Sequence, residues 1–594
     1  MNIVTKTFAV ALVLTLTATG LWAAGAEEEP AAAVEKEMVR DPTTGKMVVA
    51  PQYGGTLTLH LHPYSPQATD PYYHYSGGII SGVVEKLGIG NWGIDRDVWD
   101  FKSGPTPESV MIEQLAESWD ISPDGRTYTF HIRQGVHWHN KAPMNGRELT
   151  ADDVEYNFHR LLGMGKFADA GPSPVGGAAP FVSIPWESVT ATDKHTMVVK
   201  LTKPYLPALR LMLVDYFIYI SPPEVIEQYG DMKDWRNVVG TGPFELTDYV
   251  EDSSATWTKI PDYWGYDEKY PQNRLPYVDK LRGLMIPEEA SIMAAMRTGK
   301  IDYRRWVENQ LASVLSLQRT NPEIAAWPVW FRSGSSFAPT VGVPPFDDIN
   351  VRRAMQMALD LEPIKATYWR GYADTTPHGL VGVKGYYIPF DEWPDEVKQY
   401  YTYDPEAAEK LLDEAGYPRG ADGTRFKTSV NVSVGNTDIT EIIVSQWAEI
   451  GVDVEIDAVP YDVHNERVFS RTWEGLHQTN MGNLYDPVMM VGWFHSDAVW
   501  NRPGSRWPEV DAMVDAALNA TTIEEQQRLI AEADMYMIEK HWQIWGGKPA
   551  VYYLAQPWLI GYNGEMDTGL DPLGFNLLFA RLWIDSELKK EMGY

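Results

Sequence analysis

Residues 115–138 read LAESWDISPDGRTYTFHIRQGVHW, and this stretch decides the fold. Its second half alternates apolar and polar residues, so three side chains share one buried face of a strand: Tyr128, Phe130 and Ile132. The preceding Ser122-Pro123-Asp124-Gly125 predicts a turn, because proline presets φ and glycine tolerates a positive φ. The stretch therefore indicates a half-buried sheet.

A helix and an earlier strand flank this sheet. Thr150 and Asp153 stand at the two positions of a capping box, and apolar residues follow them at helical spacing. Residues 56–61 alternate with period two and predict a strand.

The second half of the chain repeats the combination of helix and strand. Asp404-Pro405 caps a helix that Gly416 ends. A further helix stops at Gly451, and residues 452–456 then alternate as a strand. Helix, glycine stop and strand in succession indicate α/β units, and no repeat of fixed period accompanies them.

The N-terminus has the pattern of an exported protein. Lys6 precedes an apolar run from Phe8 to Ala24, and Ala24-Gly25-Ala26 fits a signal-peptidase site. We expect a cleavable signal peptide over residues 1–26. Its removal deletes one lysine and no acid, which changes the net charge from -31 to -32. Residues 27–53 are expected to form a flexible tether.

Bulk composition excludes several classes of function. A chain of 594 residues predicts several domains. A net charge of -31 argues against nucleic acid and anionic membranes as partners. The absence of cysteine excludes disulfides, thiolate sites and a lipid-bearing N-terminal cysteine. We therefore expect a soluble protein in the periplasm or outside the cell, and not a lipoprotein.

Motifs for catalysis and cofactors are scarce. Gly88-Ile89-Gly90-Asn91-Trp92-Gly93 matches GxGxxG, but its flanks favour a glycine-rich loop over a dinucleotide site. A zinc site at His131, His137 and His139 is weighed against solvated polar positions, which are favoured. No cofactor and no metal are expected, and we predict that the chain is not an enzyme.

Tryptophan and tyrosine are abundant, with 23 and 32 residues. Many lie in irregular segments, among them Trp493 and Trp500. Most large aromatics fill cores, but some are expected to line a cleft, where flat rings suit sugars and peptide side chains.

Several ordered motifs resemble one family. The stretch quoted above is followed by 149–154 (LTADDV), 239–244 (VGTGPF), 296–302 (MRTGKID), 345–354 (PFDDINVRRA), 403–408 (YDPEAA) and 485–487 (YDP). This series resembles the extracellular solute-binding proteins of family 5, the peptide and nickel receptors of ABC importers.

The resemblance implies a two-lobed α/β fold of the periplasmic binding protein (Venus-flytrap) type, with an extra subdomain inserted in lobe one. The expected boundaries place lobe I at 54–90, 190–327 and 546–594, the inserted subdomain at 91–189, and lobe II at 328–545. It also implies capture of an oligopeptide or oligosaccharide between the lobes, delivery to ABC permease subunits, and a monomer. The alternative is an exported glycoside hydrolase, which needs two carboxylates in its cleft.

Ligand-binding positions follow from the same resemblance. Asn483 falls where peptide-binding members carry a carboxylate for the α-ammonium, four residues before the proline of the Asp486-Pro487 pair. Tyr461 and His477 fall at or near positions of a cleft tryptophan and a cleft arginine. The expected set is Asn483, Tyr461, His477, Asp486, Trp493, Trp500 and Tyr64. An amide at 483 suits sugar hydroxyls better than an ammonium, whereas the family favours peptides, so both ligand classes stay open.

Overall fold

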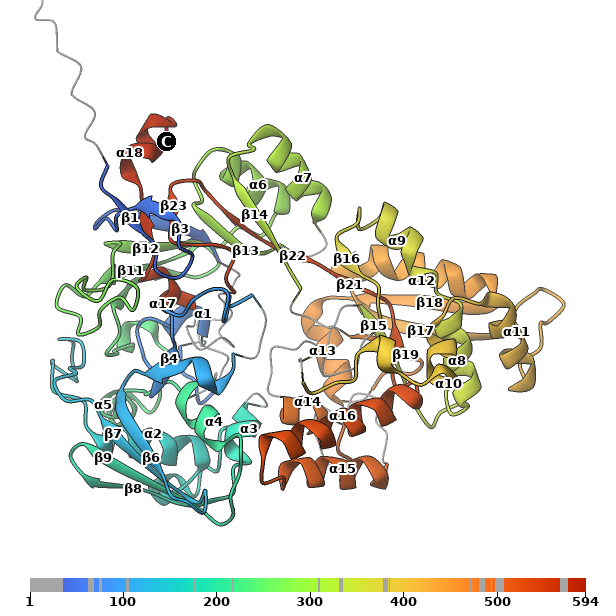
Figure 1. The fold of residues 1–594 in the computed structure, drawn as a ribbon, viewed down its shortest axis with the longest axis horizontal. Coiled ribbons are helices and arrows are strands. Elements are labelled where there is room, and N and C mark those ends of the chain that lie inside the picture. The colour runs from blue at the N-terminus through green and yellow to red at the C-terminus, as the bar shows by residue number, and fades with distance from the viewer. Residues whose placement is uncertain are drawn as a thin grey trace, which may run out of the picture.

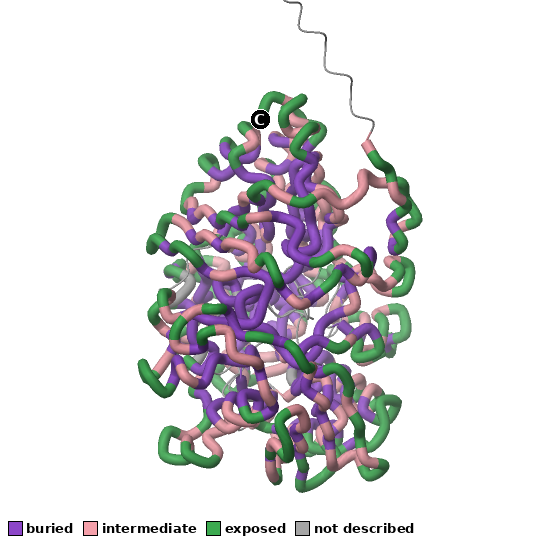
Figure 2. The backbone as a smooth tube through the Cα atoms, turned by 90° about the vertical axis from the view of Figure 1, so that its left-hand side faces the viewer, coloured by how far each residue is buried: buried purple, intermediate pink, exposed green. Residues whose placement is uncertain are grey.

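A computed structural model describes residues 36–61, 69–73, 77–102, 106–175, 178–215, 218–307, 310–330, 335–377, 383, 385–470, 472–479, 487–492, 494–496, 507–566 and 575–594. The chain forms two lobes, each built around its own sheet (Figure 1). Buried backbone runs through the interior of the first lobe, and exposed backbone lies mainly at its periphery (Figure 2).

The first lobe contains a seven-stranded sheet. Its order is β10 (Phe244–Val250), β11 (Ser254–Lys259), β12 (Lys280–Leu284), β3 (Thr56–His60), β13 (Tyr303–Val307), β22 (Val551–Ala555) and β14 (Ala325–Val329). Strand β3 pairs in parallel with β12 and β13, and the other neighbours are antiparallel. Helices α6 (Glu289–Arg297) and α7 (Leu311–Thr320) pack against the β22 side of this sheet.

A four-stranded antiparallel sheet adjoins the first lobe. Its order is β6 (Ala116–Ile121), β7 (Thr127–Ile132), β9 (Thr196–Leu201) and β8 (Trp186–Asp193), and helix α2 (Ala151–Leu162) packs on it. Tyr128, Phe130 and Ile132 are buried as predicted, and the capping box of Thr150 and Asp153 is formed. The sheet includes β9, which lies beyond the boundary expected at residue 189. It shares one hydrophobic core with the large sheet.

The second lobe contains a five-stranded sheet. Its order is β18 (Val452–Val459), β17 (Phe426–Ser433), β19 (Leu476–Thr479), β15 (Ser336–Pro339) and β20 (Ile544–Trp545). Strands β18, β17 and β19 are parallel, whereas β15 is antiparallel to β19 and β20. Helices α8 (Ile349–Met357), α11 (Pro405–Glu414) and α12 (Thr437–Glu449) supply much of its core.

Three helices form a second core within this lobe: α14 (Pro487–Gly492), α15 (Pro508–Leu518) and α16 (Ile523–Glu539). The remaining α-helices are α1 (Gly77–Ile80), α3 (Ala179–Val182), α4 (Ala208–Val214), α5 (Pro223–Tyr229), α9 (Leu361–Thr367), α10 (Asp395–Lys398), α13 (Tyr461–Ser470), α17 (Phe575–Phe579) and α18 (Ser586–Glu591). Four strand pairs complete the fold: β1 (Met38–Arg40) with β2 (Met47–Val49), β4 (Gly88–Gly90) with β5 (Met111–Glu113), β16 (Ala373–Asp374) with β21 (Lys548–Pro549), and β23 (Leu559–Ile560) with β24 (Trp583–Ile584).

Two segments connect the lobes. One leads from β14 to β15 and the other from β20 through β21 to β22. They are joined to each other, since Gly546 N donates to Ser335 O at 2.8 Å and Ser335 N donates to Gly547 O at 2.8 Å. Side chains are excluded here, because a Cβ on Gly546 would lie 2.5 Å from Ser335 O. These paired segments are the only described route of the backbone between the two lobes.

Part of the expected tether is folded. Residues 38–49 form the β1–β2 hairpin, and Lys36 pairs with Asp585 of the C-terminal region at 2.8 Å. Asp41 and Lys269 form a buried ion pair at 3.2 Å. A tether is expected from the local sequence because it is poor in apolar residues. In the structure this segment is ordered by contacts with residues more than 200 positions away.

One glycine motif differs from expectation, and a second is explained by close packing. Gly88 to Gly90 form strand β4 and not a loop. In the VGTGPF motif the glycines provide space: a Cβ on Gly240 would lie 1.7 Å from Val83 O, and one on Gly242 would lie 2.4 Å from Gly82 O. Among the described residues, no helix is long and apolar enough to cross a membrane.

Candidate functional site

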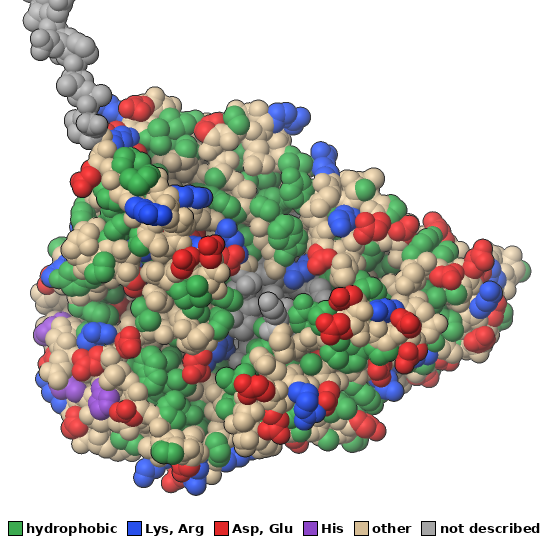
Figure 3. Space-filling model, in the orientation of Figure 1, with side chains coloured by type: hydrophobic (Ala, Val, Ile, Leu, Met, Phe, Trp, Pro, Cys, Tyr) green, Lys and Arg blue, Asp and Glu red, His purple; other side chains and the backbone are tan. Residues whose placement is uncertain are grey.

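The parallel strands of both lobes end at the junction between the lobes. Thr479, the last residue of β19, pairs with Ser336. Ser336 follows directly after the first connection between the lobes, and it also pairs with Trp545, where the second connection begins. In the first lobe Val307, the last residue of β13, pairs with Tyr552 where β22 begins. Ligands of open α/β sheets bind beyond the carboxyl ends of parallel strands. The junction is therefore the candidate site, and Figure 3 shows the surface hollowed there.

The second lobe carries a buried cluster of aromatic and polar side chains at β19, the strand that ends at the junction. His477 on β19 is 1% exposed, and its ring lies 4.5 Å from that of His464 on α13, between centroids, and 5.3 Å from that of Trp473. The next residue, Gln478, points to the other side, where its Oε1 accepts from Asn436 Nδ2 at 3.1 Å. This alternation places His477 against α13 and Gln478 against the start of α12.

The first lobe contributes basic side chains at the end of β3 and in the first half of β13. His60 bonds through Nε2 to Ile286 O at 3.1 Å. Burial lowers its pKa to about 4, and the positive charges of Arg304 and Arg305 act in the same direction. Arg304 is held by a two-point ion pair with Glu289, of which Nη1 to Oε1 is 2.7 Å.

Strand β13 is irregular beside these residues. The register of its pairing with β22 shifts between Arg304 and Val307, and Trp306 has a φ of 58°. A bulge redirects side chains at the rim of a sheet, and a positive φ in a large residue is strained. Such strain is common at binding sites.

The two lobes also meet across from their connections. The Lys203 ammonium of the first lobe donates to Asn519 Oδ1, just beyond the end of α15. Leu518, the last residue of α15, packs against the core of the first lobe as well as against its own. The junction is thus bounded by the connections at one end and by this contact at the other.

Few of the predicted ligand-binding residues can be placed. His477 is described, and Tyr461 begins helix α13, which carries His464 to His477. The side chain of Tyr461 and the whole of Asn483, Asp486, Trp493, Trp500 and Tyr64 lie outside the described residues. Their roles stay predictions. His464 and Trp473 were not predicted, although Trp473 lies only four residues before His477.

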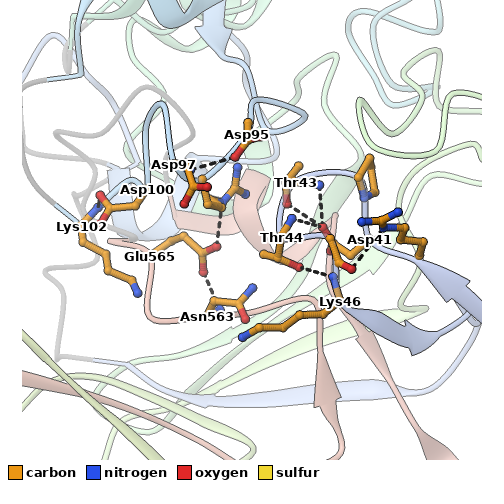
Figure 4. Close-up of a pocket in the computed structure, with 14 residues that line it drawn as sticks. Asp41, Thr43, Thr44, Lys46, Asp95, Asp97, Asp100, Lys102, Asn563 and Glu565 are labelled. Atoms are coloured by element: carbon orange, nitrogen blue, oxygen red, sulfur yellow. Dashed lines mark hydrogen bonds and ion pairs between the residues drawn. The ribbon is translucent and has the colours of Figure 1, made fainter.

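A separate pocket of about 520 Å³ lies on the first lobe, between the β1–β2 hairpin, residues 95–102 and residues 563–565 (Figure 4). Much of its charge is already used internally. Arg96 donates to Glu565 Oε1 at 3.2 Å, and Asp95 and Asp100 accept from backbone N–H groups of their own turns. Because these side chains already pair with one another, we do not take this pocket as the principal site.

The three histidines weighed as a zinc site have separate partners. His131 lies 3.1 Å from Asp120, His137 bonds to Gly146 O and His139 bonds to Gly242 O. Within the described part of the chain, no three His, Asp or Glu side chains are grouped as a metal site would require.

Comparison with known proteins agrees with this architecture. The profile of the bacterial extracellular solute-binding proteins, family 5 Middle, matches residues 110–502. The dipeptide-binding protein of Escherichia coli is 28% identical over 475 residues, covering 75% of this chain and 77% of that protein. Heme-binding protein A of Haemophilus influenzae is 27% identical over 467 residues, covering 73% and 78%.

Among solved structures, the periplasmic binding protein DppA of Helicobacter pylori, in complex with the peptide STSA, superimposes with a TM-score of 0.70. The sequence identity is 23%, and the match covers 90% of this chain and 99% of that one. The predicted two-lobed α/β fold of a periplasmic binding protein is confirmed. The relatives and structural neighbours are binding proteins and not enzymes, which agrees with the prediction that the chain is not an enzyme.

Proposed function

Because the chain belongs to the bacterial extracellular solute-binding proteins of family 5, we propose that it captures a short peptide between its lobes and delivers it to the permease of an ABC importer. The observation that carries the proposal is the junction itself. Parallel strands of both sheets end there, and the two connections between the lobes are hydrogen-bonded to each other at Ser335. Such a pair of connections permits hinge closure around a ligand.

The peptide class rests on relatives whose names and complexes involve a dipeptide and the tetrapeptide STSA. A neutral oligosaccharide is the second candidate, and one observation favours it. Asn483 replaces the carboxylate expected to hold an α-ammonium, and an amide can donate to and accept from hydroxyl groups. We therefore propose a peptide that is not held mainly by its amine.

We further propose that the protein acts as a monomer outside the cytoplasm, after removal of residues 1–26. The basis for export and cleavage is the apolar run that ends at Ala24-Gly25-Ala26. N-terminal sequencing of the exported protein is expected to begin near Glu27. Retention of residues 1–26 in a membrane fraction would contradict this.

The test of function combines identification and closure. Mass spectrometry identifies small molecules released on denaturing the purified protein, and calorimetry measures binding of di- to penta-peptides and di- to hexa-saccharides. Solution scattering should show a smaller radius of gyration with bound ligand. Cleavage of an oligosaccharide during incubation would favour the hydrolase alternative, and an unchanged scattering curve with ligand bound would refute the hinge.

A further inference from the structure

Lys548, on one of the two connections between the lobes, is a mostly buried lysine for which the described residues provide no ion pair. Its residue is 9% exposed. Among the residues that the structure describes, no hydrogen bond or ion pair holds its ammonium, although Asp374 is its direct neighbour across the β16–β21 pair. Lysine is almost never buried unless it is paired.

The strand register shows which way Lys548 faces. Ala373 pairs with Pro549, and Ala373 belongs to the core of the second lobe. Paired residues share a face and successive residues alternate, so Asp374 and Lys548 lie on the face turned away from that core. Tyr372 lies on this same face and packs edge to face on Tyr552 of β22, with ring centroids 5.9 Å apart. This face is therefore directed toward the first lobe.

A mostly buried lysine side chain whose ammonium is not paired with any described group is costly, and the fold does not require it. Burial lowers the pKa of Lys548, and the negative charge of Asp374 offsets this only in part. If Lys548 only packed against the connection between the lobes, an apolar residue of similar length would give a more stable protein than the lysine does. An anionic ligand group that entered the junction would supply the missing partner.

We propose that Lys548 anchors a carboxylate of the ligand at the hinge. This deepens the proposed function and rests on it. The carboxylate is either the C-terminus of a peptide or the acid group of a sugar acid, and the recognition chemistry is the same for both. The amide of Asn483, whose place in the site is a prediction, is consistent with a ligand anchored by its carboxylate, because such a ligand does not need a carboxylate partner for its amine.

The test compares ligands that differ only in this charge. The probes are tri-alanine and its C-terminal amide, and digalacturonate and neutral galactobiose, each measured by calorimetry. The variants are Lys548→Met, Lys548→Arg and, as a control of equal charge change, Lys427→Met, whose side chain is 76% exposed. Urea unfolding of each variant reports its stability.

Wild type and Lys427→Met should bind the carboxylate member of one pair about 10- to 100-fold tighter than its neutral match. Lys548→Met should lose this difference without loss of stability, and Lys548→Arg should keep most of it. The pair that shows the effect identifies the source of the carboxylate. Persistence of the preference in Lys548→Met overturns the proposal, as does an equal loss of affinity for both members together with lower stability.

The failure of the proposed function is distinguishable from these results. If wild type binds none of the four probes and releases no small molecule on denaturation, capture of a small ligand is itself wrong. If wild type and Lys548→Met release the same carboxylate-bearing molecule in equal amounts, only the role of Lys548 is wrong.

Discussion

His139 should make the folded state sensitive to acid, and His139→Gln should reduce that sensitivity. The side chain is 4% exposed, and its Nε2 bonds to Gly242 O at 2.8 Å. Burial lowers its pKa from 6.5 to about 4. The folded state therefore binds fewer protons than the unfolded chain between these values, so stability is lost as the pH falls through this window.

The magnitude follows from the width of the window. At 1.36 kcal/mol per pKa unit, protonation of His139 removes about 3 kcal/mol of unfolding free energy between pH 6.5 and pH 4. His60 acts with the same sign, since burial also lowers its pKa to about 4. Glu85 acts with the opposite sign: burial raises its pKa from 4.5 to about 7, so its contribution is complete below pH 4.5 and lost as the pH rises to 7. The wild-type curve alone mixes these effects.

The difference between variant and wild type isolates His139. Glutamine keeps an N–H donor for Gly242 O but does not titrate. Urea unfolding at pH 8, 6.5, 5.5 and 4.5 should show that His139→Gln loses about 2 kcal/mol less than wild type between pH 6.5 and 4.5. The partly exposed His131 provides the control variant His131→Gln, which should follow wild type. Parallel curves for wild type and His139→Gln would refute the reasoning.

Three further outcomes are expected. Gly240→Ala should destabilise by more than about 3 kcal/mol in urea unfolding, because its Cβ would lie 1.7 Å from Val83 O, whereas Gly416→Ala has open space and should cost about 1 kcal/mol for its positive φ; equal costs would contradict this. Asn483→Asp should tighten binding of free-amine peptides about 10- to 100-fold by calorimetry without improving N-acetylated ones, and an equal gain for both would show that residue 483 does not read the amine. His541→Phe should stabilise by about 1–2 kcal/mol, because no described group bonds to either of its two buried ring nitrogens while the ring stacks on Tyr401; a lower urea midpoint would contradict this.

Local patterns predicted the elements of the fold well. The capping box at Thr150 and the cap at Asp404 depend on residues within one helical turn, and both are formed. The alternation around Phe130 likewise reports a burial pattern that the strand realises residue by residue. In each case the residues that carry the sequence pattern lie within a few positions of the element that they form.

Long-range contacts were not predictable in the same way. The β1–β2 hairpin depends on the Asp41–Lys269 pair, whose members are separated by 228 positions. The close packing at Gly240 could not be predicted either, because a sequence shows a glycine but not the backbone of Val83 that passes beside it. The aromatic cluster of the second lobe was missed except for His477, because no spacing rule joins α13 to β19.

The arrangement of the cores bears on how a ligand would be captured. Among the described residues, the buried clusters of the first lobe share no residue with those of the second. Besides the two connections, the described contacts between the lobes include the packing of Tyr372 on Tyr552, the packing of Leu518 on the core of the first lobe and the hydrogen bond from Lys203 to Asn519. An exposed polar contact of this kind contributes at most about 1 kcal/mol. Residues on a hinge axis move least during rotation, whereas the two walls of the junction, at the ends of β19 and β3, approach each other on closure. An anchor at Lys548 would therefore hold a ligand before the lobes close, and the walls would add their contacts afterwards. Capture and selection would then lie on different residues: the hinge would require a carboxylate, and the walls would discriminate among the molecules that carry one.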